Sequence, residues 1–285
     1  MTGQPASSTG PGTTVAATTP AEHLRHVAQT FAGADDPRLA EIMQAAVRHL
    51  HRFVEEVGLT HQEWLAGIRF LTSVGHNCDE LRQEFILLSD TLGVSMLVEM
   101  VNEQPAAGAT EPTVLGPFYV DGAPARAFGD SIVDDPATGG DPLVVHGTVS
   151  DLEGHPVAGA TVDVWQVQPN GRYDIEDDPL RRNLRAVFTT GGDGRYRFHT
   201  VRPVDYTIPD DGPVGVMLRA GGRRSWRPAH IHLMVAAPGF KTLVTHVFDE
   251  ASPWLGEDAV FGVRNSIIAP MDANECAFDV VIERS

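Results

Sequence analysis

The sequence predicts an α+β protein, in which an N-terminal helical domain is followed by an antiparallel β-sandwich domain. Apolar residues recur every three or four positions over the first third of the chain, which is typical of amphipathic helices. After residue 142 the period becomes two, as in half-buried strands, and the segment QPAAGATEP (104–112) separates the two patterns. We therefore expect a disordered tail over residues 1–21, a helical domain over 22–103 and the sandwich over 104–285.

The N-terminal segment MTGQPASSTGPGTTVAATTP has the Gly, Pro, Ser and Thr content that is typical of disorder. It lacks the basic start and the apolar stretch of a secretory signal, and no later segment is apolar enough to span a bilayer. Cys78 and Cys276 are the only cysteines, and they fit no disulfide framework or Cys-pair metal motif. We expect a cytoplasmic protein that is not embedded in a membrane.

The helical period is clearest between Leu39 and Val57, and Gly58 is suited to end that helix. Thr60 with Glu63 forms a capping-box pattern ahead of the next apolar run. Apolar stretches continue to residue 101, so the sequence predicts a handful of packed helices in this region.

Short β-rich runs follow, with turn signals such as DLEG, GGDG and APG between them and no helices expected among them. The runs are LVVHGTVSDLEG, ATVDVWQV, RAVFTT, RYRFHTV, HIHLMVAA, TLVTHVF and AFDVVIE. Their spacing predicts an antiparallel sandwich.

The formal net charge of -17 argues against a nucleic acid or an anionic membrane as a partner. Arginines nevertheless crowd the approach to His230, at positions 219, 223, 224 and 227. They could hold an anionic ligand, or the first three could be solvated loop residues.

The segment SWRPAHIHLMV (225–235) places two histidines on one face of a predicted strand. His230 and His232 could be two ligands of one metal or two polar residues on a solvated face. An imidazole pair suits zinc, copper, iron or nickel equally. Tyr173 and Tyr206 lie in loops after strands, and two phenolates would favour Fe(III), although most tyrosines are packing residues.

Several segments resemble, in order and spacing, the intradiol ring-cleaving dioxygenases. They are LGPFYV (115–120), GATVDVWQ (159–166), GRYD (171–174), PVDYTIP (203–209) and RPAHIH (227–232). The segment FLTSVGHNCDELRQEFILLSDTLGVSMLVEMVN is similar to the helical domain of that family, and the resemblance covers about residues 24–283.

The resemblance implies a non-haem Fe(III) cofactor whose ligands are Tyr173, Tyr206, His230 and His232. It also implies two catalytic residues. Arg227 would face the bound substrate and stabilise charge that builds on the ring. The Tyr206 phenolate would accept a proton from the substrate.

The resemblance further implies a substrate pocket lined by Leu87, Asp90, Val114, Leu115, Gly116, Pro117, Phe118, Ile208, Pro209, Arg227 and His246. Asp90 would be the partner of a substrate hydroxyl, or else a helix cap or a salt-bridge residue. His246 would be a hydrogen-bond partner beside the metal or a plain sheet histidine.

The stretch THVFDEASPWLGEDAVFGV (245–263) resembles the branch of the family that cleaves hydroxyquinol (benzene-1,2,4-triol) with O2 to 3-hydroxy-cis,cis-muconate or maleylacetate. In that stretch His246 stands where catechol-preferring members usually have glutamine. A catechol or chlorocatechol 1,2-dioxygenase is the alternative enzyme, and a non-catalytic transthyretin-like binding module is the alternative of another class. The resemblance also implies a homodimer through the helical domain, with a bound lipid.

Overall fold

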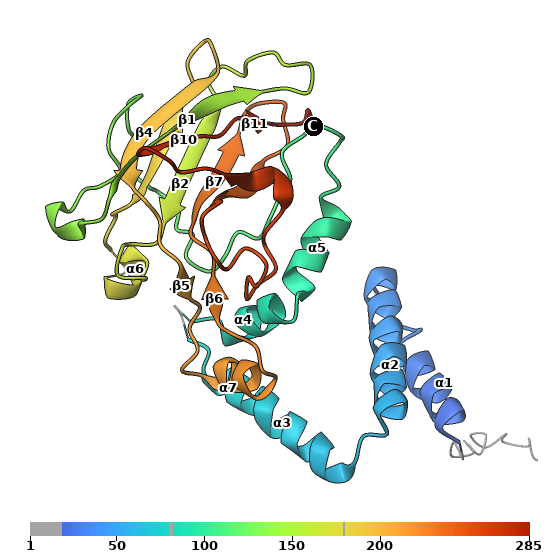
Figure 1. The fold of residues 1–285 in the computed structure, drawn as a ribbon. Helices are drawn as coiled ribbons and strands as arrows, with labels where there is room; N and C mark the ends of the chain where they lie inside the picture. Colours follow the sequence, from blue (N-terminus) through green and yellow to red (C-terminus); the bar gives the residue numbers. More distant parts are fainter. Residues whose placement is uncertain (1–18, 80–81, 179) are drawn as a thin grey trace, which may run out of the picture. The chain divides into compact units, whose positions relative to one another are not determined.

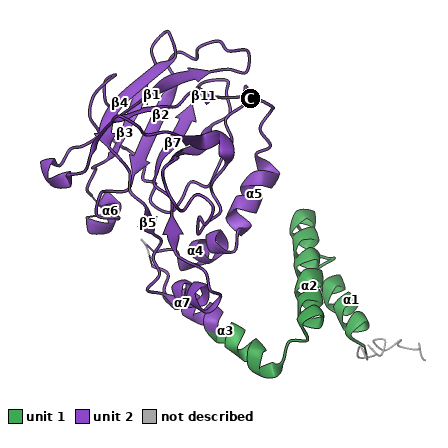
Figure 2. Cartoon of the chain, in the orientation of Figure 1, with its two compact units in different colours: residues 1–69 green, residues 70–285 purple. Residues whose placement is uncertain are grey.

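The computed structural model describes residues 19–79, 82–178 and 180–285, which divide into two compact units (Figure 2). The first unit ends at Arg69 and contains α1 (Pro20–Thr30), α2 (Pro37–Val57) and the beginning of α3 (His61–His76). The second unit, residues 70–285, contains the rest of the chain. The helices of the described residues all lack the length or the hydropathy that a membrane span requires.

Local signals explain where the N-terminal helices begin and end. The Thr19 hydroxyl accepts a hydrogen bond from the Glu22 amide, and the Glu22 carboxylate accepts one from the Thr19 amide, which forms a capping box. Because Thr19 caps the helix, Pro20 and Ala21 belong to α1 and not to the predicted tail. The tail up to residue 18 lies outside the described residues. Gly58 ends α2 in the left-handed conformation, at φ 60°, and the Thr60–Glu63 capping box is also present, so both predictions are confirmed.

Two further helices, α4 (Glu84–Thr91) and α5 (Val94–Asn102), fall in the second unit, although the sequence placed them in the helical domain. α4 packs against α7 (Pro213–Ala220), and an apolar cluster that includes Leu88, Val214 and Leu218 fills the space around them. The predicted boundary between the helical domain and the sandwich domain, at residues 103 and 104, stays a prediction. The two compact units of the structure meet at residues 69 and 70.

The expectation that no helix interrupts the strands was wrong, because α6 (Asp174–Asp177) and α7 lie among them. Pro213 at the first turn of α7, with buried Val214 and Leu218 four positions apart, is a helical signal that is too short to stand out beside the strand pattern.

The second unit is built on a sandwich of two main sheets (Figure 1). One sheet has the order β3 (Arg185–Thr189), β2 (Thr161–Gln166), β7 (His230–Ala236), β8 (Leu243–Asp249) and β9 (Ile268–Ala269). In the other, β1 (Pro142–Ser150) pairs with β4 (Arg195–Val201), β10 (Glu275–Ala277) and β11 (Val280–Val281). A separate ribbon joins β5 (Tyr206–Thr207) to β6 (Trp226–Arg227), and η1 (Pro136–Thr138) and η2 (Asn265–Ile267) are 3-10 turns.

The α+β class is confirmed, but the sheets are not purely antiparallel. β1 runs parallel to β10 and β11, and β8 runs parallel to β9, whereas the remaining pairs are antiparallel. The connections that lead to β9, β10 and β11 are loops and not crossover helices, so the sequence pattern does not distinguish the two directions.

One main-chain contact in the sandwich requires glycine. A Cβ built on Gly147 of β1 would lie 1.8 Å from the Phe278 carbonyl oxygen, which also accepts the Tyr196 hydroxyl. We expect Gly147→Ala to lower the free energy of unfolding by on the order of 3 kcal/mol, because backbone must move to admit the methyl group.

Urea denaturation measures this effect, and Gly192→Ala is the matched control. A Cβ at Gly192 meets nothing within 4 Å, so we expect a change of less than about 0.5 kcal/mol there. Equal stabilities of the two variants would contradict the prediction.

Candidate metal centre

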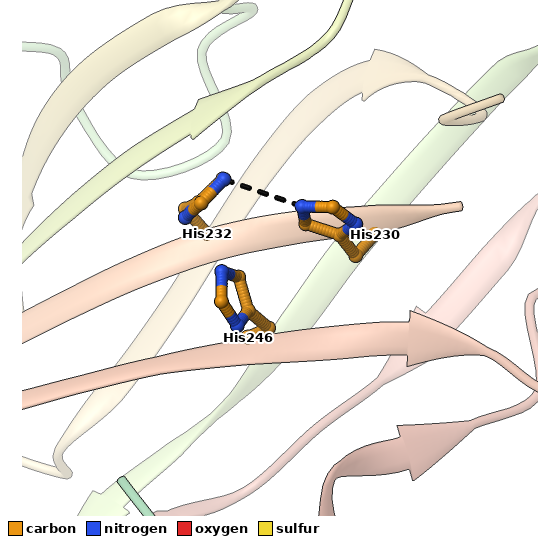
Figure 3. A group of neighbouring side chains, drawn as sticks. All are labelled: His230, His232 and His246. Atoms are coloured by element: carbon orange, nitrogen blue, oxygen red, sulfur yellow. Dashed lines mark hydrogen bonds between the residues drawn. The ribbon is translucent and has the colours of Figure 1, made fainter. Parts of the chain in front are cut away.

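Three imidazoles meet on one face of the five-stranded sheet. Along β7, Ile231, Leu233 and Val235 enter the sandwich core, so His230 and His232 project from the opposite face, as predicted. His246 on β8 is the register partner of His232, and Figure 3 shows the three rings side by side. All three side chains are buried, and one nitrogen from each lies within 4.8 Å of the others, so the described residues contain a histidine group that could hold a metal.

Two loops bring tyrosines to the same place. Tyr173 directly precedes α6, and Tyr206 begins β5. The Tyr173 hydroxyl lies 2.9 Å from His232 Nε2 and 3.2 Å from the Tyr206 hydroxyl, while His230 Nε2 lies 3.2 Å from His232 Nε2. The four side chains that the sequence singled out as metal ligands therefore converge in one buried cluster.

The spacing of these donor atoms is compatible with a shared metal ion as well as with hydrogen bonds. Ligand atoms bound at about 2.1 Å, with angles of 90–109°, lie about 3.0–3.4 Å apart. Although the Tyr173 hydroxyl can donate one hydrogen bond within the cluster, His232 Nδ1 has no hydrogen-bond partner among the described residues. Nitrogen and phenol oxygen donors packed without a carboxylate form a set suited to a trivalent transition metal.

Burial keeps the two histidines of β7, His230 and His232, neutral. It lowers the pKa of His230 well below the usual value, and the positive charge of Arg227 acts in the same direction. Burial likewise lowers the pKa of His232. His230 Nδ1 lies 2.7 Å from the Pro228 carbonyl oxygen, and if it donates there, the Nε2 lone pair is free to bind a metal.

Burial also raises the pKa of both tyrosines. For Tyr173 the pKa lies well above 10, and the neighbouring Tyr206 adds to the effect of burial. For Tyr206 burial again dominates, but the nearby Arg227 guanidinium opposes it. Ionisation of this pair therefore needs a cation in the cluster to stabilise the phenolates.

Aromatic rings fix the positions of the donors. Trp165 of β2 stacks on His232 at 4.6 Å, and Phe118 stacks on Tyr173 at 4.4 Å. Gly116 has φ +76°, and a Cβ there would lie 3.4 Å from His232 Cε1, so the loop that carries Phe118 passes directly over the imidazole. The sequence did not identify Trp165, because an aromatic residue in a strand has no signal that distinguishes this position from the core.

His246 is buried, and neither of its ring nitrogens has a hydrogen-bond partner among the described residues. Its ring centroid lies 4.1 Å from that of His232 and 4.7 Å from that of His230. It therefore lies within the buried imidazole group, and its part as a hydrogen-bond partner beside the metal stays a prediction.

Arg227 is the one member of the arginine group that reaches the cluster. Its Nη1 lies 3.4 Å from the Tyr206 hydroxyl, and it is 4% exposed. By contrast, Arg219 bonds the Asp210 carbonyl, Arg223 bonds the carbonyls of Thr91 and Ala259, and Arg224 lies over the Trp254 ring. These three arginines do not build an anion site with Arg227.

Arg227 has a partner that sequence reasoning missed. Its Nε donates to Asp258 Oδ1 at 3.1 Å, and both side chains are buried. Asp258 lies 31 residues beyond Arg227, in a loop without regular structure, so no local pattern links the two.

An open pocket of about 800 Å³ adjoins the cluster and has Tyr206 on its wall. Of the predicted pocket residues, Leu87, Pro117, Phe118, Ile208 and Pro209 also line it. The other predicted pocket residues lie off this wall. Val114 packs in the apolar cluster that also contains Leu87 and Ile208, and Leu115 is 38% exposed. Gly116, Arg227 and His246 lie beside the donor atoms of the cluster.

Asp90 also lies off the wall of the pocket, but it is close enough to Arg227 and Asp258 to interact with their charges. It is 6% exposed on α4, one turn from Leu87, and burial raises its pKa. A hydrogen bond from Ser95 and the charge of Arg227 oppose that rise. Asp90 is thus a buried carboxylate in the field of Arg227, and its part as the partner of a substrate hydroxyl stays a prediction.

The chain is similar to known dioxygenases over most of its length. Residues 114–283 match the family model described as Dioxygenase, and residues 36–110 match the model described as Catechol dioxygenase N terminus.

Individual relatives extend this similarity. Hydroxyquinol 1,2-dioxygenase of Rhizobium sp. (strain MTP-10005) is 51% identical over 245 residues, which cover 85% of this chain and 82% of that protein. 6-chlorohydroxyquinol 1,2-dioxygenase of Cupriavidus pinatubonensis is 51% identical over 238 residues, covering 82% and 86%. The crystal structure of hydroxyquinol 1,2-dioxygenase from Pseudomonas putida DLL-E4 superposes with a TM-score of 0.88 at 45% identity, covering 93% of this chain and 99% of that one.

Proposed function

The chain belongs to the family of intradiol ring-cleaving dioxygenases, and from that premise we propose that it cleaves hydroxyquinol (benzene-1,2,4-triol) with O2 between two hydroxyl-bearing carbons. The product is 3-hydroxy-cis,cis-muconate or its tautomer maleylacetate. The observation that carries this proposal is the buried convergence of two phenols and two imidazoles at 2.9–3.2 Å beside an open pocket of about 800 Å³. Catechol and chlorocatechol are the alternative substrates.

We assign the metal as non-haem Fe(III), held by Tyr173, Tyr206, His230 and His232. Phenolates are hard anionic donors, so they favour the ferric ion over zinc and ferrous iron. When bound there, ferric iron draws electron density from a diol and makes its ring reactive toward O2.

The chain's own residues hold the substrate and its protons. The Tyr206 Oη, as a phenolate, accepts one proton from the incoming diol. Arg227 Nη1 lies 3.4 Å from that oxygen, where its positive charge stabilises the phenolate before the transfer and the deprotonated diol after it. The Arg227 guanidinium also faces the ring, where it stabilises negative charge that develops during cleavage. Leu87, Phe118 and Ile208 exclude water from the ring faces.

Three measurements on the purified protein test this proposal together. Metal analysis should find iron, the visible spectrum should show a phenolate-to-iron charge-transfer band that colours the protein wine-red, and 18O2 should label the diacid product with both oxygen atoms. A full complement of zinc with intact activity, or a yellow semialdehyde product, would overturn it.

The preference for hydroxyquinol depends on Asp90. An ionised carboxylate is a strong acceptor for the third hydroxyl of the substrate. We expect Asp90→Ala to lower kcat/KM for hydroxyquinol by about 10- to 100-fold, and to lower kcat/KM for catechol much less, because only the triol loses a partner.

Steady-state kinetics on both substrates check this prediction, and Asp90→Asn is the matched control, since it keeps an acceptor of the same size. Equal losses on the two substrates would make Asp90 a structural residue. Equal efficiency of the wild type on both would overturn the preference for hydroxyquinol.

We further propose that the protein is a cytoplasmic homodimer that associates through its helical region and binds a lipid chain there. The support is the number of large apolar side chains that α2 leaves between 44% and 63% exposed: Leu39, Ile42, Leu50, Phe53, Val54 and Val57. Such a face is covered by another apolar surface in water. Light scattering should give about twice the chain mass of 30.7 kDa, and mass spectrometry of an organic extract should detect the lipid. A monomer at micromolar concentration would contradict the dimer.

A further inference from the structure

We propose that Asp258 is a positioning residue for the ring-cleavage reaction, because it fixes the Arg227 guanidinium in the orientation that faces the substrate. This inference rests on the proposed function, which gives Arg227 a substrate to face. Asp258 itself touches neither the donor cluster nor the wall of the pocket among the described residues.

The Asp258 carboxylate accepts three hydrogen bonds. Oδ1 accepts the Arg227 Nε–H at 3.1 Å and the Val260 amide at 3.3 Å, and Oδ2 accepts the Gly262 amide at 2.8 Å. Asp258 is 5% exposed, so water does not compete strongly for these bonds. The loop over residues 258–262 therefore holds the carboxylate rigidly, and the carboxylate holds Arg227.

The bond to Nε determines where the other two nitrogens of Arg227 point. A guanidinium is planar, so fixing its Nε–H direction also fixes the plane of Nη1 and Nη2. Nη1 is left 3.4 Å from the Tyr206 hydroxyl, across the β5–β6 pair in which Tyr206 and Arg227 are register partners. Nη2 is buried and has no hydrogen-bond partner among the described residues, which is costly unless a substrate group accepts from it.

A glycine makes this arrangement possible. A Cβ at Gly262 would lie 3.1 Å from Thr113 Oγ1 and 3.2 Å from both Arg227 Nη2 and Asp258 Oδ2, which is tighter than ordinary contact. The missing side chain lets the loop close on the ion pair. Gly262→Ala crowds the Arg227 and Asp258 side chains, together with Thr113, without removing any charge, so we expect it to disturb the orientation of Arg227.

A double-mutant cycle tests the inference. We expect Arg227→Met to lower kcat/KM by about 10²- to 10³-fold, mainly through kcat, as for loss of a preorganised charge-stabilising donor. We expect Asp258→Asn and Gly262→Ala to lower kcat by about 10-fold or more in the wild-type background. Each should change it less than about 2-fold in the Arg227→Met background, because they act through Arg227.

Iron content and the phenolate-to-iron band are measured on every variant, and both should match the wild type. Gly262→Ala keeps the inference testable if Asp258→Asn fails to fold. If the loss of kcat in a double variant equals the product of the two single losses, or if the loss follows a loss of iron, the inference about Asp258 is wrong while the proposed function stands. Wild-type turnover of Arg227→Met would overturn the proposed substrate role of Arg227 and this inference with it.

Discussion

Replacing Tyr173 by Phe is expected to remove most of the visible absorption band, because Tyr206 is the one phenolate of the proposed ligand set that remains, and to lower turnover by at least about 100-fold. Losing a residue that merely orients a metal ligand costs about 10- to 100-fold, so losing a proposed ligand should cost more. Phe keeps the ring that stacks on Phe118 and removes only the oxygen that lies 2.9 Å from His232 Nε2. The measurements are iron content, the visible spectrum and kcat.

Tyr119→Phe is the control for this substitution. Its hydroxyl lies 2.9 Å from Asp121 and 3.4 Å from Asp163, neither of which is a proposed ligand, and Phe keeps the ring that packs on Trp165, so we expect the colour and the activity of that variant to match the wild type. A Tyr173→Phe protein whose charge-transfer band keeps the position and intensity of the wild-type band would show that Tyr173 is not a ligand.

Replacing Asp174 by Ala is expected to lower the free energy of unfolding by about 3–5 kcal/mol, because it leaves the Arg185 guanidinium buried without its counter-ion. Asp174 is fully buried and accepts both Arg185 Nε and Nη2, as well as the Asn183 amide. Arg185 also donates to the Phe118 carbonyl, so the pair ties the Tyr173 loop to the loop that covers it.

Urea denaturation of three variants checks this prediction. Arg172→Ala breaks an exposed ion pair with Asp177 and should cost no more than about 1 kcal/mol. The double variant Asp174→Leu, Arg185→Met should cost less than Asp174→Ala, because no charge remains buried. A loss below about 1 kcal/mol in Asp174→Ala would contradict the argument.

Local patterns in the sequence predicted those parts of the site that depend on local geometry. The alternation of residues in a strand alone puts His230 and His232 on one face. Tyr173 and Tyr206 were candidates from their loop positions, the motif resemblance implied that they are ligands, and the fold brings them beside the histidines. The helix end at Gly58 and the cap at Thr60 are equally local.

Contacts between distant segments could not be predicted in this way. Asp258 meets Arg227, and Trp165 stacks on His232, only because the loops and strands fold together. The parallel pairs of β1 escaped prediction for the same reason, since strand direction is set by the path of the connection and not by the residues in the strand.

The pairing of β1 with β10 and β11 has a consequence for how the chain reaches this structure. The Thr148 amide donates to Asp279, which follows 131 residues later, and Val149 pairs with Val280. During synthesis β1 leaves the ribosome long before these partners exist, so one of its edges stays open while most of the second unit is made. Contacts of such high sequence separation slow folding, and an open edge invites pairing with other chains. Yield in a heterologous host should therefore respond to translation rate and to chaperones more than to changes at the metal cluster.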